Sequence, residues 1–211
     1  MYTIVVRSLA ISGSATLIAS IWSVPLAYVL VRSKTSRLII PLMEGLVGVP
    51  TVLIGLLLYM LLSSNGPLGY LGLLYTPQAI MIGQSVLVTP LITSVSYRVL
   101  TQAWDKYGEL ALSLGADEGQ ALRLVISESL PGILGAVIMG FSRALGELGV
   151  ALMVGGNIKG YTRVMTTAIA LEVSRGEFEL AIWLGIFLVV IIAMISLSLR
   201  ILGRVNDDRA V

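Results

Sequence analysis

Two charged side chains lie inside a long apolar run and are the first residues in this sequence that could do chemistry. Arg143 and Glu147 are four residues apart near the middle of the run 131–154, so in a helix they share one face. Each charge at bilayer depth costs about 2.5–3.5 kcal/mol on insertion scales, and we therefore expect both to face protein. Two roles stay open: a structural ion pair that holds this helix to its neighbours, which we favour, or a positive site that Arg143 offers to a passing anion.

The sequence lacks the residues that most catalytic schemes need. It contains no cysteine and no histidine, which excludes disulfides, zinc sites and catalysis by a thiol or an imidazole. It has no G-x-x-x-x-G-K-[ST] motif, so we expect no ATP site and no cofactor in this chain. We count Arg143 and Glu147 as the only charged pair buried in a membrane span, which disfavours an intramembrane enzyme. The net charge of +2 is too small to indicate a nucleic-acid partner.

Long apolar blocks must position these residues. The chain is 56% hydrophobic and only 12% charged, whereas a soluble domain carries about twice that charged fraction. About 20 helical residues are enough to cross the hydrocarbon core of a bilayer. We therefore predict an all-α integral membrane protein with a single domain over residues 1–211. Its predicted spans are 4–31, 38–62, 77–99, 131–154 and 179–202.

Residue patterns within the first two spans indicate how these helices pack. The first span carries small hydroxyls at four-residue spacing, which suits close packing against another helix. These residues are Ser8, Ser12, Thr16 and Ser20. The second span contains Pro41 and Pro50, and we expect it to bend or break around 48–51. Such a break is tolerated only against protein or a wet cavity.

The charges of the connections predict which side of the membrane each one faces. Arg32, Lys34 and Arg37 lie within the first connection, whereas the connection 63–76 has no charge. The tail after the fifth span carries Arg204 and Arg209. Positively charged connections stay in the cytoplasm. We therefore expect a multi-pass protein of the inner or plasma membrane with its N-terminus outside and its C-terminus in the cytoplasm.

The predicted outer connection 155–178 contains polar candidates of its own. Asn157, Lys159 and Arg163 could meet an anion or an external partner at the outer mouth of a pathway. An ordinary solvated loop is an equally good interpretation of Lys159.

The connection after the third span, about 98–130, differs from the rest of this apolar chain. Its part 102–128 mixes apolar and charged positions, forms helix readily and is too polar to cross a bilayer. Gly115 interrupts the pattern, so we predict two short helices that meet at a turn, the second ending at Leu130-Pro131. Two interpretations stay open: an amphipathic linker that lies on the membrane surface, or a knob that inserts into a cytoplasmic partner.

This segment resembles the cytoplasmic EAA loop of permease subunits of binding-protein-dependent ABC importers. Glu109, Ala111 and Gly115 match the loop's Glu, alanine and glycine, and Leu110 stands in place of its first alanine. The Leu-Pro that closes the loop falls three residues later than is commonest. The resemblance implies a coupling helix that docks into an ATPase subunit. The residues it assigns to this coupling are Glu109, Ala111, Gly115, Ala116 and Asp117.

The segments 141–149, 155–158 and 162–172 resemble the oxyanion branch of these permeases, which handles molybdate and tungstate, and look most like tungstate-uptake permeases. The resemblance implies a type I ABC importer permease fold and a homodimer in the lipid bilayer. It also implies an extracytoplasmic oxyanion-binding protein and two copies of a separate ATPase that binds ATP and Mg²⁺. Permeases for molybdate, sulfate or phosphate are the alternatives. A passive anion channel is disfavoured, because import of an anion against the membrane potential costs about 2.3 kcal/mol per charge per 100 mV.

Overall fold

Four long helices dominate the chain, and the part that the structure describes contains no strand. The computed structural model describes residues 2–207, with side chains over residues 2–197. The side chains of Arg204 and Arg209 lie outside the described residues. The helices are α1 (Tyr2–Val31), α2 (Ser36–Val47), α3 (Thr51–Leu62), η1 (Gly69–Leu71), α4 (Pro77–Ala103), η2 (Trp104–Gly108), α5 (Glu109–Ser113), α6 (Glu118–Leu145), α7 (Gly149–Gly155), α8 (Met165–Ser174) and α9 (Phe178–Asp207).

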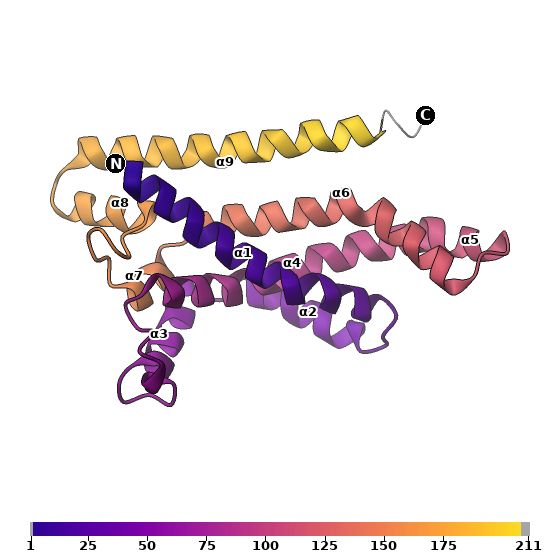
Figure 1. Cartoon of the computed structure of the whole chain (residues 1–211), viewed down its shortest axis with the longest axis horizontal. Coiled ribbons are helices and arrows are strands. Elements are labelled where there is room, and N and C mark those ends of the chain that lie inside the picture. The colour runs from indigo at the N-terminus through magenta and orange to yellow at the C-terminus, as the bar shows by residue number, and fades with distance from the viewer. Residues whose placement is uncertain (1, 208–211) are drawn as a thin grey trace.

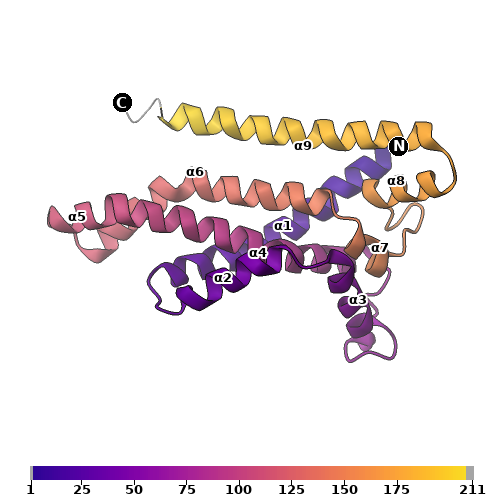
Figure 2. The same ribbon diagram turned by 180° about the vertical axis from the view of Figure 1, so that it is seen from behind.

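Both ribbon views show the long helices running between two ends of an elongated molecule (Figures 1 and 2). The N-terminus, α3, α7 and α8 lie at one end, which we call the α8 end. The turn between α1 and α2, α5 and the last turns of α9 lie at the other, which we call the α5 end. Within residues 2–197, four helices are long and apolar enough to cross a membrane, and the pair α2 and α3 makes a fifth candidate. The predicted all-α membrane architecture is confirmed.

The small hydroxyls of α1 face the interior. Ser8, Ser12 and Thr16 are each only 2% exposed, and α1 packs mainly against α4 and α6. Thr16 Oγ1 donates to the backbone oxygen of Ser12, so this buried hydroxyl is satisfied within its own helix. Close packing is therefore possible without an unpaired donor at this position.

The predicted break in the second span is confirmed. The axes of α2 and α3 meet at 98°, with Gly48, Val49 and Pro50 between them. Pro50 has no N–H and disfavours helical backbone at Val49, which explains the position of the break. Pro41, in contrast, lies inside α2. At ~1.5 Å per residue, α2 alone is too short to cross a bilayer.

The predicted fourth span, 131–154, is wrong at both bounds. The helix α6 starts at Glu118, passes through Pro131 and ends at Leu145, and α7 is a separate short helix. Proline is tolerated inside apolar helices when neighbouring groups satisfy the freed carbonyl, so Pro131 did not mark a boundary. Similarly, α4 continues past Val99 through the π-helical turn η2 into α5. The two helices that we expected to be short are therefore the ends of long ones.

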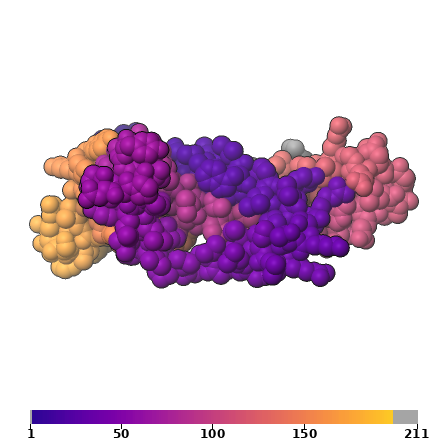
Figure 3. Space-filling model, turned by 90° about the horizontal axis from the view of Figure 1, so that it is seen from below, coloured from indigo at the N-terminus to yellow at the C-terminus, as the bar shows by residue number. Residues whose placement is uncertain are grey.

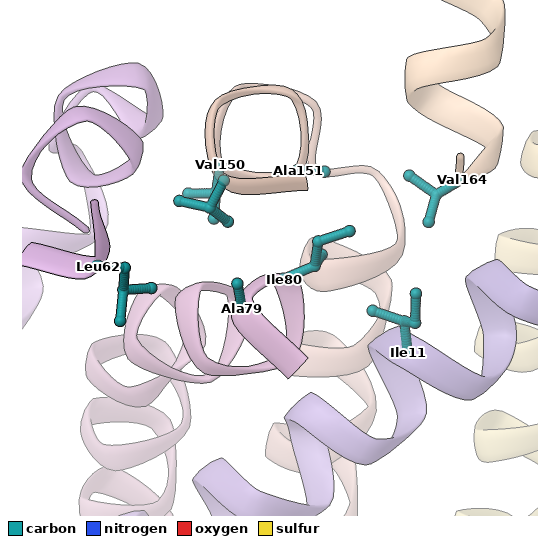
Figure 4. Close-up of a cluster of buried hydrophobic side chains, with 8 residues drawn as sticks. Ile11, Leu62, Ala79, Ile80, Val150, Ala151 and Val164 are labelled. Atoms are coloured by element: carbon teal, nitrogen blue, oxygen red, sulfur yellow. The ribbon is translucent and has the colours of Figure 1, made fainter. Parts of the chain in front are cut away.

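The predicted outer connection 155–178 is not a simple loop. It contains α8, whose first residues Met165, Thr166 and Thr167 are buried. A cluster of buried apolar side chains joins α1, α3, α4 and α7 to the residue that precedes α8 (Figure 4). Its members are Ile11, Leu62, Ala79, Ile80, Val150, Ala151, Val154 and Val164. The irregular backbone on either side of α7 is thus packed against protein, as a break at membrane depth requires.

Candidate functional site

Arg143 and Glu147 form an ion pair, but at a different place from the predicted one. Arg143 lies in the last turn of α6, and Glu147 follows the end of that helix, in the break before α7. Arg143 Nη1 donates to Glu147 Oε2 at 2.8 Å. Glu147 Oε1 accepts from the N–H of Val150 at 3.1 Å, in the first turn of α7. The carboxylate therefore joins the end of one helix to the start of the next.

The two partners of this ion pair differ in exposure. The Glu147 side chain is 2% exposed, whereas that of Arg143 is 36% exposed. Glu147 has both oxygens engaged, while the guanidinium has five N–H donors and uses one of them within the described residues. Glu147 is therefore fixed in the interior, and Arg143 can still donate to something else.

Two further side chains hold this break, and sequence reasoning missed both. Gln84 of α4 is 1% exposed, and its Nε2 donates to the backbone oxygen of Ala144 at 3.0 Å. Thr166 of α8 donates through Oγ1 to the backbone oxygen of Glu147 at 2.7 Å. Side chains from two other helices thus bond to backbone oxygens on either side of the end of α6. Gln84 could have been found in the sequence, because it is an amide side chain inside the apolar run of α4.

A cavity of about 420 Å³ lies where the two helix breaks meet. Thr51 and Val52, which begin α3, line it together with Gly149, which begins α7. A Cβ on Gly149 would lie 2.6 Å from Thr51 Oγ1 and 3.0 Å from the nitrogen of Val52, so this glycine permits the close approach. Arg143 and Glu147 complete the polar part of the lining, and among the described residues Arg143 is its only cation.

A second candidate site is the tip at the α5 end, formed by α5, residues 114–117 and the first turn of α6. The turn predicted at Gly115 is present, with a φ of +90° that favours glycine. Ala116 donates through its N–H to the oxygen of Ala111 at 3.0 Å, which closes α5. Asp117 caps α6 and exchanges hydrogen bonds with Gln120 in a capping box. Local hydrogen bonds therefore close the turn between α5 and α6.

Apolar side chains project from this tip. Leu110, Leu112 and Leu114 are 57%, 39% and 79% exposed. Glu109 and Asp117 are exposed beside them, and the tip projects from the body of the molecule (Figure 3). Neighbouring exposed leucines beside charged residues are typical of a surface that binds another protein.

Arg32, the residue directly after α1, contacts the tip, a link that the sequence did not reveal. Arg32 Nη2 lies 3.0 Å from Glu118 Oε2, and its guanidinium carbon lies 5.1 Å from the centroid of the Trp104 ring. Trp104 begins the π-helical turn η2. The tip is thus connected to α1 as well as to the two helices that carry it.

The third candidate group lies at the α8 end. Arg163 donates through Nε to Asn157 Oδ1 at 3.1 Å, so the two predicted residues are brought together. Arg7 of α1 donates to the backbone oxygens of Gly160 at 2.6 Å and Arg163 at 3.2 Å. Lys159 is exposed. Arg163 therefore donates hydrogen bonds to its own loop.

A second ion pair lies within the predicted spans, but it is exposed. Glu44 lies inside the predicted second span, and its Oε1 accepts from Arg98 Nε at 3.2 Å, which links α2 to α4. Among the described residues this pair does not contradict the expectation that Arg143 and Glu147 are the charged pair buried in a span. The pair of Glu44 and Arg98 is more exposed, at 39% and 65% of its side chains. Among the described residues, no group of three or more acidic side chains could hold a metal ion.

Comparison with known proteins assigns the chain to a family. A profile of the family described as "Binding-protein-dependent transport system inner membrane component" matches residues 15–211. The tungstate uptake permease TupB of Peptoclostridium acidaminophilum is 39% identical over 193 residues, which are 90% of this chain and 85% of that protein. TupB of Campylobacter jejuni is 37% identical over 158 residues, 75% of this chain and 66% of that protein.

The fold is also that of a known transporter. A chain from inward-facing structures of the MetNI methionine ABC transporter superposes with a TM-score of 0.71, covering 94% of this chain and 92% of that one at 14% identity. The predicted permease fold is confirmed. This chain belongs to the family of inner membrane components of binding-protein-dependent transport systems.

Proposed function

We propose that this chain is the membrane-spanning permease of an ATP-driven, binding-protein-dependent ABC importer for an oxyanion, most specifically tungstate. The observation that carries the proposal is the tip at the α5 end, where a fixed turn presents Leu110, Leu112 and Leu114 to a partner. The assignment of tungstate as the substrate rests on the similarity to permeases named for tungstate uptake. Molybdate, sulfate and phosphate are the competing substrates.

A separate ATPase supplies the energy in this proposal. The sequence has no phosphate-binding loop, whereas accumulation of a divalent anion inside a negative membrane potential requires an energy source. Two ATPase copies bind the tips of a permease homodimer, whose closed two-fold symmetry gives each ATPase an equivalent site. In the assigned roles, Glu109, Ala111, Gly115, Ala116 and Asp117 form the coupling contact.

The α5 end faces the cytoplasm in this proposal, and the α8 end receives the external binding protein. The distribution of charge supports this orientation, because Arg32, Lys34 and Arg37 lie at the α5 end and the uncharged connection 63–76 lies at the α8 end. Asn157 and Arg163 then lie on the side from which the anion arrives. Their mutual hydrogen bond favours a role in shaping that surface.

Transport follows from relative movement of the two permease copies. ATP binding closes the ATPase dimer, draws the two tips together and opens the α8 ends toward the binding protein. The anion passes into the space between the copies, and ATP hydrolysis resets the inward-facing state. The pair of Arg143 and Glu147 keeps α6 and α7 joined during these movements, because Glu147 bonds to both helices.

The proposal is tested by uptake into proteoliposomes that contain the permease and its ATPase, with the loaded binding protein outside. We expect accumulation of radiolabelled tungstate that requires ATP and is competed more weakly by molybdate, sulfate and phosphate. Flux of the anion through the permease alone, without ATP, would indicate a channel and contradict the mechanism. Equal competition by molybdate would contradict the substrate assignment alone.

The contact with the ATPase is tested separately by Gly115→Ala. A Cβ at Gly115 meets nothing within 4 Å, so its effect comes from the strained backbone, about 1–2 kcal/mol at a φ of +90°. We expect weaker capture of the ATPase by affinity pull-down, with unchanged membrane insertion. Gly135→Ala, also in open space but inside α6, is the matched control and leaves capture unchanged. Normal capture by Gly115→Ala would count against the coupling role.

A further inference from the structure

The cavity where the two helix breaks meet has the chemistry of an anion site. Three polar groups line it: the Arg143 guanidinium, the Thr51 hydroxyl and the Glu147 carboxylate. Its volume of about 420 Å³ lies within the range of small-molecule pockets, so a tetrahedral oxyanion fits with part of its water shell. The cavity is lined by the break residues of α6 and α7 and by the first residues of α3.

Arg143 is the principal donor to this cavity. Within the described residues its guanidinium gives a single hydrogen bond, from Nη1 to Glu147, and its side chain is 36% exposed. Arginine presents its N–H groups in a planar fork that matches the oxygens of an oxyanion. Four donors of Arg143 therefore stay available to an anion in the cavity.

The start of α3 adds further donors. Its N-cap is Pro50, which has no side chain that could accept from the first turn, and α3 has 12 residues. Within the described residues, the N–H groups of Thr51 and Val52 have no acceptor. These groups carry the partial positive charge of a helix start, and the Thr51 hydroxyl lies beside them in the lining.

Glu147 sets the strength of the site. Its carboxylate neutralises Arg143 and would repel an anion, but it is 2% exposed and both of its oxygens are engaged. An incoming anion must therefore compete with Glu147 for the guanidinium. Such a site binds weakly, and weak binding is what a conducting pathway requires, because a strong site would hold its ion.

We propose that this cavity is a transient station for the transported oxyanion, at which Arg143 exchanges its bond to Glu147 for one to the anion. The inference rests on the proposed import of an oxyanion and adds the place where the permease contacts it. The structural role and the anion-binding role of Arg143 are then compatible, because the same ion pair joins α6 to α7 and sets the affinity for the anion.

Equilibrium dialysis of radiolabelled tungstate against the permease–ATPase complex in nanodiscs, without the binding protein, tests this directly. Glu147→Gln leaves Arg143 uncompensated, so we expect tungstate to bind at least about tenfold more tightly than to the unsubstituted complex. In uptake assays the same variant should have a lower maximal rate, since release is slower. A purely structural role for the pair predicts no gain in binding.

Three further variants complete the test. The double variant Arg143→Gln, Glu147→Gln should lose the gain in affinity, and Arg143→Lys, Glu147→Gln should retain only part of it, because lysine has no fork. Arg98→Gln is the matched control, because it removes an arginine that pairs with a carboxylate outside the cavity, and tungstate binding should not change. Size-exclusion profiles verify that each complex is assembled.

The outcomes separate the two proposals. The anion station would be overturned if Glu147→Gln bound tungstate no more tightly than the unsubstituted complex. It would also be overturned if the gain in affinity persisted in the double variant Arg143→Gln, Glu147→Gln. Either result would hold even if ATP-driven uptake is normal. Absence of uptake by the unsubstituted complex would contradict the proposed function, whatever the dialysis gives.

Discussion

Each end of this molecule contacts an arginine at one end of α1, Arg7 inside the helix and Arg32 directly after it, but the two ends are bonded differently. At the α8 end, the buried hydroxyl of Ser8 accepts from the N–H of Met165 at 2.8 Å. Arg7 adds a part-buried bond to the backbone oxygen of Arg163 and an exposed one to that of Gly160. At the α5 end, Arg32 contacts an exposed carboxylate and the face of an indole ring. The α8 end therefore consists of segments locked to one another, whereas the α5 end is a self-supporting tip with exposed connections.

This difference fits the demands on a permease. Bonds between buried groups are costly to break, because each unsatisfied group loses its solvation. Exposed ion pairs contribute little, so the tip can move relative to α1 at low cost. A tip that keeps its own shape while moving is suited to transmit a displacement, and a locked opposite end is suited to respond as a unit.

The largest effect is expected at the break that anchors the α8 end. Glu147→Leu leaves Arg143 without its counterion and the N–H of Val150 without its acceptor, which should destabilise the fold by about 3 kcal/mol. The double variant Arg143→Met, Glu147→Leu should be less destabilised than the single one. The unfolding temperature of the purified permease in detergent measures both. Equal unfolding temperatures for the single and double variants would show that the two side chains are not coupled.

An intermediate effect is expected for a buried hydroxyl at the same end. Thr162 Oγ1 accepts from the N–H of Ile158 at 2.9 Å and donates to the oxygen of Gly155 at 2.5 Å. Thr162→Val leaves both backbone groups unsatisfied, and we expect a loss of about 1–3 kcal/mol in thermal unfolding. Ser113→Ala at the tip removes an exposed hydroxyl bonded only to its own helix and serves as the control. Similar losses at the two positions would remove the distinction between the ends.

The smallest effect on stability is expected at the link between α1 and the tip. Arg32→Ala removes an exposed ion pair and one cation–π contact, together worth about 1 kcal/mol or less. We expect a change of at most a few degrees in the unfolding temperature, and partial recovery when Arg32→Glu is combined with Glu118→Arg. A loss as large as that of Glu147→Leu would mean that the tip is held as firmly as the opposite end.

Sequence reasoning worked where a local pattern decides the backbone. The break at Pro50 and the turn at Gly115 follow from residue types alone, and both are present. It failed where tertiary contacts decide. The helix α6 continues through Pro131, and no proline marks its end at Leu145. Gln84 and Thr166, from other helices, bond to the backbone oxygens of Ala144 and Glu147 at that end.

The placement of Glu147 shows the same limit. A spacing of four residues predicts a shared helix face, and the ion pair does form, but the helix ends between its two members. Only the packing of α7 against α1, α3 and α4 explains why the chain breaks there. The role of Arg32 was equally hidden, because Trp104 and Glu118 are far from it in sequence.

Hydrogen exchange of the permease in nanodiscs, with and without its ATPase, tests the central claim most directly. We expect slow exchange over 162–168 in both states, because most of these residues are buried and several of their amides bond to Ser8, Thr167 and backbone oxygens. Over 109–120 we expect fast exchange in the permease alone and clear slowing when the ATPase binds. Equal protection of the two segments without the ATPase, or no slowing of 109–120 in the complex, would contradict the account of a locked α8 end and a docking tip.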